Sequence, residues 1–292
     1  MGSALCILGF FYPTPDISIA FDFPYCRTVA AEPPIAARAA YAYDVQSGAI
    51  LFEKDSDAQL PLASLTKIMT VLTASQALTP TTTVEISKDA LTPEGESGLT
   101  VGEKWRVKDL ADFTLITSSN DGARALMLAS SDALHMRQED FYAAMNRRAE
   151  ALNLSGTYFI NETGLDVSSS TAGAYGSARD VAHLLAYAST AIPALVDGSV
   201  KEEETFTSLS GINHKATNTS SLAATLIGSI ASKTGYTDLA GGNLAVIYEP
   251  VPGRPVAIAV LGSTREGRDD DVRILSTYAG DVLKRDILCS SL

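Results

Sequence analysis

The order of the apolar segments constrains the fold of this chain more than any other feature of its sequence. Two short apolar runs between residues 40 and 52 flank a turn-like Gln46-Ser47-Gly48, and strand-like runs at 227–234, 243–249 and 256–261 precede a closing apolar helix. Because strands and helices do not alternate strictly, this order indicates an α+β domain. We therefore expect the strands near both ends of the chain to form one antiparallel sheet together with the terminal helix, which packs on it.

The middle of the chain is predicted to be mostly helical. Apolar residues recur at helical spacing in segments 63–77, 108–116, 121–129, 139–152 and 177–187. Ser177 precedes the last of these and is of a type that caps helix N-termini. A short polar break at 117–120 separates two apolar helices, so we expect its side chains to lie in a tight loop.

Charge and residue counts exclude several kinds of function. The chain has 22 Lys and Arg against 34 Asp and Glu, a net charge of −12, which argues against a nucleic-acid binder. The cysteines (Cys6, Cys26 and Cys289) lack CxxC spacing, so no zinc site or disulfide framework is indicated, although a Cys26–Cys289 bridge stays open. With only 3 histidines, none in a metal-binding spacing, a mechanism without histidine is favoured.

The first 36 residues have two interpretations. Residues 4–23 are rich in Leu, Ile and Phe, and Thr28-Val29-Ala30 could form a cleavage site, yet no Lys or Arg precedes the run and prolines interrupt it. Residues 1–36 are therefore either an export leader or an N-terminal arm. No other stretch approaches the ~20 apolar residues of a spanning helix, so we expect membrane association only through the N-terminus.

The first chemical motif, Ser64-Leu65-Thr66-Lys67, opens the first predicted helix. Its i, i+3 spacing puts a hydroxyl and an amine on one face. A serine needs a base to become a nucleophile, and a lysine can be that base if burial or nearby cations lower its pKa. Taken alone the motif is weak, because a helix-capping serine beside a solvated lysine is commoner.

Two further motifs follow in order. Ser118-Ser119-Asn120 lies in the polar break, where a hydroxyl and an amide could relay a proton and hold a peptide amide, although such residues are also common in loops. Lys233-Thr234-Gly235 ends the predicted strand 227–234. There a glycine lets a ligand approach the backbone, and a strand edge can pair with an extended peptide.

The three motifs in this order are the signature of penicillin-binding proteins and serine β-lactamases. Over residues 40–278 the chain resembles low-molecular-weight penicillin-binding proteins of the D-alanyl-D-alanine carboxypeptidase family, since residues 63–70 (ASLTKIMT), 161–166 (NETGLD) and 177–180 (SARD) also match. Gly122 stands where the family usually has alanine.

The resemblance implies a β-lactamase/transpeptidase-like α+β fold. In that fold an antiparallel sheet is flanked by the terminal helix and by an all-helical subdomain. We expect residues 37–288 to form a single DD-peptidase domain, without the C-terminal β-rich domain that many members carry.

The resemblance also implies a role for each polar motif residue. Ser64 would be the acylated nucleophile and Lys67 its general base. Ser118 and Lys233 would handle the proton that passes to the leaving group, and Asn120 would bind the substrate amide.

Four more residues would bind the substrate. The backbone N–H groups of the nucleophile and of Tyr236 would form the oxyanion hole, and Gly235 would let the ligand approach the strand. Thr234 and Arg268 would hold the terminal carboxylate of the substrate. Arg265 is the alternative arginine.

On this resemblance the chain would be an extracytoplasmic serine DD-carboxypeptidase that needs neither metal nor organic cofactor. It would remove the terminal D-Ala from peptidoglycan stem peptides that end in D-Ala-D-Ala, through an acyl-enzyme on Ser64. β-Lactam antibiotics would acylate the same serine.

Three alternatives stay open. A class A β-lactamase shares the motifs but needs a glutamate to activate the deacylating water, for which Glu162 is the candidate. A DD-endopeptidase has the same fold. A β-lactam or peptidoglycan sensor would be acylated without turning over.

Overall fold

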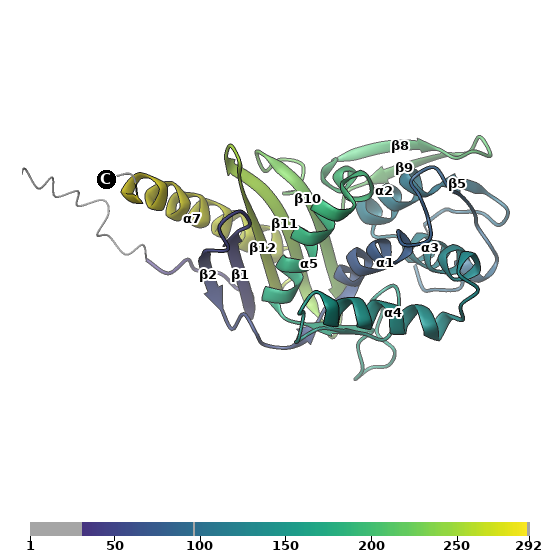
Figure 1. Cartoon of the computed structure of the whole chain (residues 1–292), viewed down its shortest axis with the longest axis horizontal. Helices are drawn as coiled ribbons and strands as arrows, with labels where there is room; N and C mark the ends of the chain where they lie inside the picture. Colours follow the sequence, from purple (N-terminus) through teal and green to yellow (C-terminus); the bar gives the residue numbers. More distant parts are fainter. Residues whose placement is uncertain (1–30, 96, 291–292) are drawn as a thin grey trace, which may run out of the picture.

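The computed structural model describes residues 31–95 and 97–290 of the chain (Figure 1). Most of the segment 1–36, whose two interpretations the sequence left open, lies outside the described residues, as do Cys6 and Cys26. Cys289 is disulfide-bonded, and its pairing with Cys26 stays a prediction.

A five-stranded antiparallel sheet forms the centre of the fold, as the sequence predicted. Its strands, in spatial order, are β10 (Ser229–Thr237), β11 (Gly241–Val251), β12 (Arg254–Ser263), β1 (Ala39–Asp44) and β2 (Ile50–Lys54). The N-terminal hairpin therefore completes a sheet that the C-terminal strands begin. The strand β10 lies at one edge, where its outer side pairs with no other strand of this sheet.

Apolar side chains bury both faces of this sheet. Val246 packs in a core cluster with Leu275 of α7 (Gly267–Ser290), whereas the next residue, Ile247, belongs to a second cluster on the opposite face. This alternation follows from the two-residue period of a strand. Figure 1 shows α7 behind the sheet and α5 (Ala178–Ala191) in front of it.

The remaining helices gather beyond the β10 edge, on the right of Figure 1. They are α1 (Thr66–Ala74), α2 (Val107–Thr117), α3 (Asn120–Ala133), α4 (Gln138–Ala151) and the short α6 (Pro193–Val196), with 3-10 turns η2 (Ala63–Leu65), η3 (Asp89–Leu91) and η4 (Asp197–Val200). All residues of α1 are buried, so this apolar helix is the central element of the helical part of the fold.

This helical part also carries small antiparallel sheets that the sequence did not predict. They are formed by β4 (Thr83–Glu85) with β5 (Lys104–Arg106), by β8 (Glu203–Thr207) with β9 (Asn213–Thr217), and by β3 (Leu60–Pro61), β7 (Ala174–Gly176) and β6 (Tyr158–Phe159). Their strands have two to five residues. The strands of two or three residues are too short for a clear alternation, and β8 and β9 consist mostly of polar residues, so the sequence carries no apolar strand pattern there.

Element boundaries differ from the prediction in two places that concern function. The segment expected as one helix from residue 63 begins as the 3-10 turn η2 and becomes α-helical at Thr66. The strand β10 continues to Thr237, so Lys233 to Gly235 lie within it and not at its end. Pairing with β11 extends it, because the two strands are joined by a tight turn after Thr237.

Ser177 caps α5 as predicted, since its hydroxyl accepts a hydrogen bond from Asp180 N.

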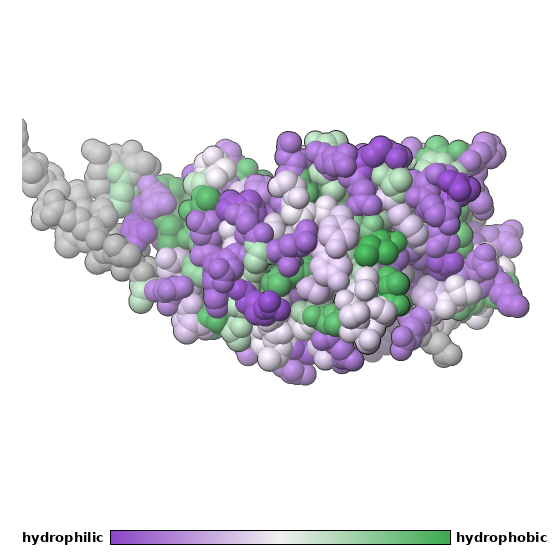
Figure 2. Space-filling model, turned by 90° about the horizontal axis from the view of Figure 1, so that it is seen from below, coloured by the Kyte–Doolittle hydropathy of each residue, from purple (hydrophilic) through white to green (hydrophobic). Residues whose placement is uncertain are grey.

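No single helix among residues 31–95 and 97–290 is long and apolar enough to cross a membrane, although the bent pair Ala178–Ala191 and Pro193–Val200 meets the length and composition criteria together. In Figure 2, polar and apolar residues are interspersed over the visible part of the face seen from below.

The departure from the family at Gly122 has a packing explanation. A Cβ atom on Gly122, in the first turn of α3, would lie 2.1 Å from Thr114 Oγ1 of α2. Thr114 is fully buried and its hydroxyl has no hydrogen-bond partner. The threonine therefore occupies the space that an alanine methyl would need.

We predict that Gly122→Ala destabilises the protein by about 1–3 kcal/mol through this clash, although alanine is the better helix former by about 1 kcal/mol. In the double variant with Thr114→Ala, the stability should return to the wild-type value or above, because the clashing hydroxyl is gone. Urea unfolding of wild type, both single variants and the double variant measures these effects. Equal losses in Gly122→Ala and the double variant would contradict this explanation.

Candidate active site

Ser64 lies in the η2 turn, directly before α1. Its hydroxyl does not cap the helix, so the structural alternative for the first motif is wrong. The preceding residue, Ala63, has a left-handed φ of +49°, a conformation that is strained for a residue with a side chain. The turn packs on β10: a Cβ on Gly235 would lie 2.7 Å from Leu62 O and 3.3 Å from Ser64 N. The glycine of the third motif is therefore needed for the close approach of the turn that carries Ser64.

Lys67 is fully buried at the start of α1. Its Nζ lies 2.7 Å from Ser64 Oγ, and it donates hydrogen bonds to Asn120 Oδ1 at 2.7 Å and to Thr163 O at 2.9 Å. Burial lowers the pKa of Lys67 to about 7, against the charge of Glu162, which raises it. A neutral amine has two N–H bonds and one lone pair, so two carbonyl acceptors leave the lone pair for the serine hydroxyl. This is the arrangement that a general base requires.

The second motif forms the turn between α2 and α3. Ser118 ends α2 in the left-handed conformation with φ +63°, and Ser119 caps α3 by accepting a hydrogen bond from Gly122 N. Asn120 uses its Oδ1 for Lys67, while its Nδ2 donates to Glu94 O at 2.6 Å. These two contacts fix the amide orientation and leave a second N–H for another acceptor.

Lys233 projects from β10 towards the same turn. Its Nζ donates to Ser118 Oγ and to Thr234 O, both at 2.9 Å. Lys233 is 2% exposed, and its pKa is held well below the usual value by burial and then by the positive charges of Lys67 and Arg268. The structure thus joins Ser64, Lys67 and Asn120 in one hydrogen-bonded group, and Ser118 with Lys233 in a second.

Arg268 begins in the first turn of α7 and reaches β10. It is 5% exposed and donates from Nη1 to Gly235 O at 3.0 Å and from Nη2 to Thr219 O at 2.8 Å, while its Nε has no hydrogen-bond partner. Thr219 Oγ1 also lies 2.5 Å from Thr234 Oγ1. Arg268 therefore holds the backbone beside Thr234 and keeps N–H groups that are not used by these two carbonyls.

Arg265 differs from Arg268 in its surroundings. It is exposed, and its guanidinium lies 5.2 Å from the centroid of the Tyr236 ring. Both arginines line a cavity of about 510 Å³, together with residues 217–221. Acidic side chains line the same cavity, namely Glu202, Glu266, Asp269 and Asp270.

Glu162 does not have the environment of a free catalytic carboxylate. It is 2% exposed, and its two oxygens accept hydrogen bonds from Arg124 Nη1 at 3.0 Å and from Tyr142 OH at 2.6 Å. Both oxygens are thus occupied. This arrangement disfavours the β-lactamase alternative, which needs a carboxylate free to activate water.

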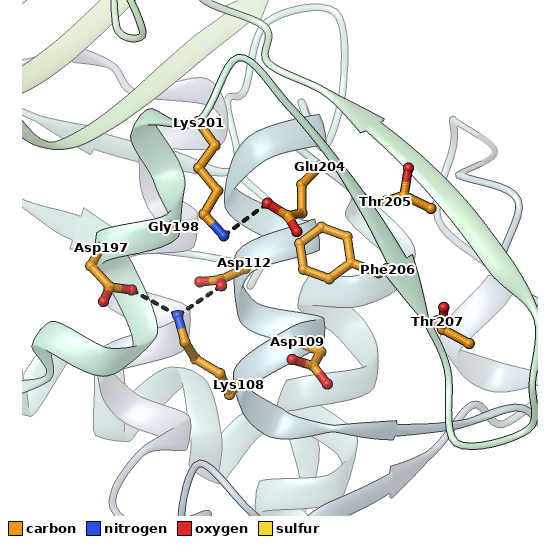
Figure 3. Close-up of a pocket in the computed structure, with 10 residues that line it drawn as sticks. All are labelled: Lys108, Asp109, Asp112, Asp197, Gly198, Lys201, Glu204, Thr205, Phe206 and Thr207. Atoms are coloured by element: carbon orange, nitrogen blue, oxygen red, sulfur yellow. Dashed lines mark hydrogen bonds and ion pairs between the residues drawn. The ribbon is translucent and has the colours of Figure 1, made fainter.

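A second cavity, of about 480 Å³, lies at the end of α2 opposite to Ser118 (Figure 3). Figure 3 shows the Lys108 ammonium between Asp112 and Asp197, with 2.7 Å to an oxygen of each. Burial raises the pKa of Asp112 to about 6. These ion pairs attach η4 to α2, and Ser199 of η4 in turn accepts a hydrogen bond from the backbone N–H that precedes Lys233 in β10.

Several contributors to the site were missed by the sequence analysis. Thr163 supplies a carbonyl to Lys67, Thr219 contacts Thr234, Ser119 caps α3, and Glu94 supplies a carbonyl to Asn120. Three of them act through backbone atoms or lie on segments without a motif. Thr163 lies in the NETGLD segment, which the sequence analysis matched to the family without giving it a role.

No group of three or more His, Cys, Asp or Glu in the described ranges could hold a metal ion.

Comparison with known proteins agrees with this geometry. Residues 27–264 match the family model described as D-alanyl-D-alanine carboxypeptidase. The chain belongs to this family. Its members include D-alanyl-D-alanine carboxypeptidase DacF of Bacillus subtilis, which is 28% identical over 250 residues, or 83% of this chain and 62% of DacF. This chain therefore spans less than two thirds of that relative's length.

Two other comparisons bear on function and fold. The D-alanyl-D-alanine endopeptidase of Escherichia coli is 30% identical over 80% of this chain and 74% of its own length. Penicillin-binding protein D2 of Listeria monocytogenes, solved in an ampicillin-bound form, superposes with a TM-score of 0.72 at 28% identity over 86% of this chain and 99% of that chain. The expected transpeptidase-like fold is thereby confirmed.

Proposed function

We propose that this protein is a serine DD-carboxypeptidase that removes the terminal D-Ala from peptidoglycan stem peptides ending in D-Ala-D-Ala. One observation carries the proposal: the buried Lys67 amine lies 2.7 Å from Ser64 Oγ, with its N–H bonds directed to Asn120 and Thr163. A neutral lysine in this position can take the serine proton without any histidine. The ampicillin-bound form of the Listeria relative supports binding of β-lactams by this chain, and we propose that they acylate Ser64.

The reaction then proceeds in two halves. Lys67 takes the Ser64 proton while Oγ bonds to the carbonyl carbon of the penultimate D-Ala, and the backbone N–H groups of Ser64 and Tyr236 stabilise the oxyanion. The C–N bond breaks as the proton taken up by Lys67 reaches the leaving amine through Ser118 and Lys233, which leaves Lys67 neutral again. Water then adds to the ester carbonyl and gives a proton to Lys67. The C–O bond to Ser64 breaks, Lys67 returns this proton to Ser64 Oγ, and the shortened peptide leaves as a carboxylic acid.

We place this activity outside the cytoplasm, where peptidoglycan lies, and in one catalytic domain over residues 37–288. Association with a membrane, if the protein has it, would be through the N-terminal segment. The substrate partners are the stem peptide and β-lactam antibiotics.

Mass spectrometry of the intact protein tests the proposal. Penicillin should add its whole mass to Ser64, because opening the β-lactam ring loses no atoms. A stem peptide ending in D-Ala-D-Ala should yield free D-Ala. An adduct on another residue would contradict the proposed nucleophile, rapid turnover of the penicillin adduct would favour a β-lactamase, and acylation without D-Ala release would favour a sensor.

DD-endopeptidase activity is the second candidate function, favoured by the 30% identity to the Escherichia coli endopeptidase. The two activities act on different bonds: the carboxypeptidase releases free D-Ala, whereas the endopeptidase cleaves cross-linked peptides. Incubation with both substrates, followed by chromatography of the products, separates them. Faster cleavage of the cross-linked peptide would replace the first proposal by the second.

We predict that Arg268, with Thr234, recognises the terminal carboxylate. Arg268→Ala should then lower the preference for a free carboxylate over a C-terminal amide by about tenfold or more, since a charge-assisted hydrogen bond contributes about 1.5–3 kcal/mol. The ratio of kcat/KM for the acid and amide peptides measures this preference, and a purely structural role of Arg268 would leave the ratio unchanged. Arg265→Ala is the matched variant, and a loss of preference there instead would assign the role to Arg265.

A further inference from the structure

The loop that contains Glu162 lies along α1 directly beside the catalytic lysine. Two successive carbonyls of the loop accept hydrogen bonds from this helix: Glu162 O from Thr70 Oγ1 at 2.6 Å, and Thr163 O from Lys67 Nζ at 2.9 Å. Both donors are fully buried. The position of the Glu162 backbone therefore determines where Lys67 finds one of its two carbonyl acceptors.

The Glu162 side chain is held from two other helices. Arg124 of α3 donates to one oxygen and Tyr142 of α4 to the other, at 3.0 Å and 2.6 Å. Arg124 is itself oriented by Asp89 O at 2.9 Å. These hydrogen bonds hold the position of a carboxylate that is 2% exposed.

Glu162 also acts on Lys67 through its charge. Burial disfavours the ammonium form of Lys67, whereas the negative charge of Glu162 favours it. Arg124 opposes this effect because its positive charge neutralises the carboxylate. Three other charged or titratable groups lie on elements packed against this cluster: Lys233 of β10, whose pKa is lowered in part by the charge of Lys67, Tyr142 of α4, which donates to Glu162, and Arg148 of α4, which donates to Leu72 O of α1.

We propose that Glu162 and Arg124 are opposing positioning residues for Lys67. Glu162 fixes the loop carbonyl that Lys67 uses, and its negative charge favours the ammonium form of Lys67, whereas the positive charge of Arg124 limits this effect. Neither side chain contacts the reacting atoms. The inference rests on the proposed function, in which Lys67 is the base that activates Ser64.

The two halves of the ion pair should shift the pH dependence in opposite directions. The acid limb is the part of the pH profile in which the acylation rate rises with pH. Glu162→Gln removes the negative charge, so this limb should move to lower pH by about one unit. Arg124→Gln leaves the carboxylate unopposed, so the limb should move to higher pH. An ion pair that only stabilises the fold would lower the rate or the stability in both variants and leave the limb in place.

The measurement is the acylation rate by a fluorescent penicillin between about pH 5 and about pH 9, with the modified residue located by mass spectrometry. Tyr142→Phe is the matched control: it removes one hydrogen bond to Glu162 without changing a charge, so its limb should coincide with that of wild type. Urea unfolding establishes that each variant is folded.

The outcomes separate the two proposals. If wild type is not acylated on Ser64, the proposed function fails. If wild type is acylated and the limb of Glu162→Gln does not move to lower pH, the inference fails alone. Should Arg124→Gln not fold, Arg124→Lys keeps the charge and must leave the limb near its wild-type position, so a large shift there would also overturn the inference.

Discussion

Replacement of Ser64 by alanine is expected to lower D-Ala release by about 10⁴-fold or more and to abolish the penicillin adduct. In the proposed mechanism Ser64 Oγ forms the acyl bond, and Ser64 supplies the one hydroxyl among the hydrogen-bond partners of Lys67. The small loss of side-chain volume at a partly exposed position should leave the free energy of unfolding nearly unchanged. Mass spectrometry and a D-Ala release assay measure both effects.

Ser75→Ala is the control for this variant. Ser75 follows the C-terminal end of α1 and donates to Leu72 O, so its loss affects the same helix without touching the site. It should retain wild-type acylation. A penicillin adduct on the Ser64→Ala protein would show that another residue is the nucleophile.

The second large effect is expected for Lys67→Met, which removes the amine while keeping most of the side-chain volume. Acylation should fall by about 10³- to 10⁴-fold, because general-base catalysis contributes about 10²–10⁴ and the buried hydrogen bonds to Asn120 and Thr163 are lost as well. The structure should remain folded, since removing an amine from a fully buried site removes its desolvation cost.

The prediction for Lys67 also fixes the direction in which the acylation rate changes with pH. Only the neutral amine can accept the serine proton, and the pKa of Lys67 is about 7. The wild-type acylation rate should therefore rise about tenfold per pH unit below pH 7 and level off above it, and this rise should be absent in Lys67→Met. Lys54→Met is the control, because Lys54 is a structural lysine that donates to Ala37 O. A wild-type rate that falls as the pH rises through 7 would contradict the assignment of Lys67 as the base.

The order of the apolar segments was enough to predict the antiparallel sheet and its closing helix, because the strands of this sheet contain buried apolar runs. Ser177 was recognised as an N-cap because capping is a local interaction: its hydroxyl accepts a hydrogen bond from the backbone N–H three residues later. The short strands β4 to β9 could not be predicted in this way. Most of them have two or three residues, and the longer β8 and β9 are mostly polar, so an apolar strand pattern is absent.

What the sequence determined by itself is the inventory of reactive groups: Ser64 and Lys67 one helical turn apart, an amide in a polar break, and a lysine before a glycine in a strand. The tertiary structure decided what those groups can do. It brought Asn120, 53 positions away, to Lys67, and it buried Lys67 so that its amine can be neutral near pH 7. It also engaged Glu162 with Arg124 and Tyr142, where residue type alone had left it as a candidate for activating water. Desolvation and charge pairing depend on what surrounds a side chain in three dimensions, and chain spacing specifies only its nearest neighbours in the sequence.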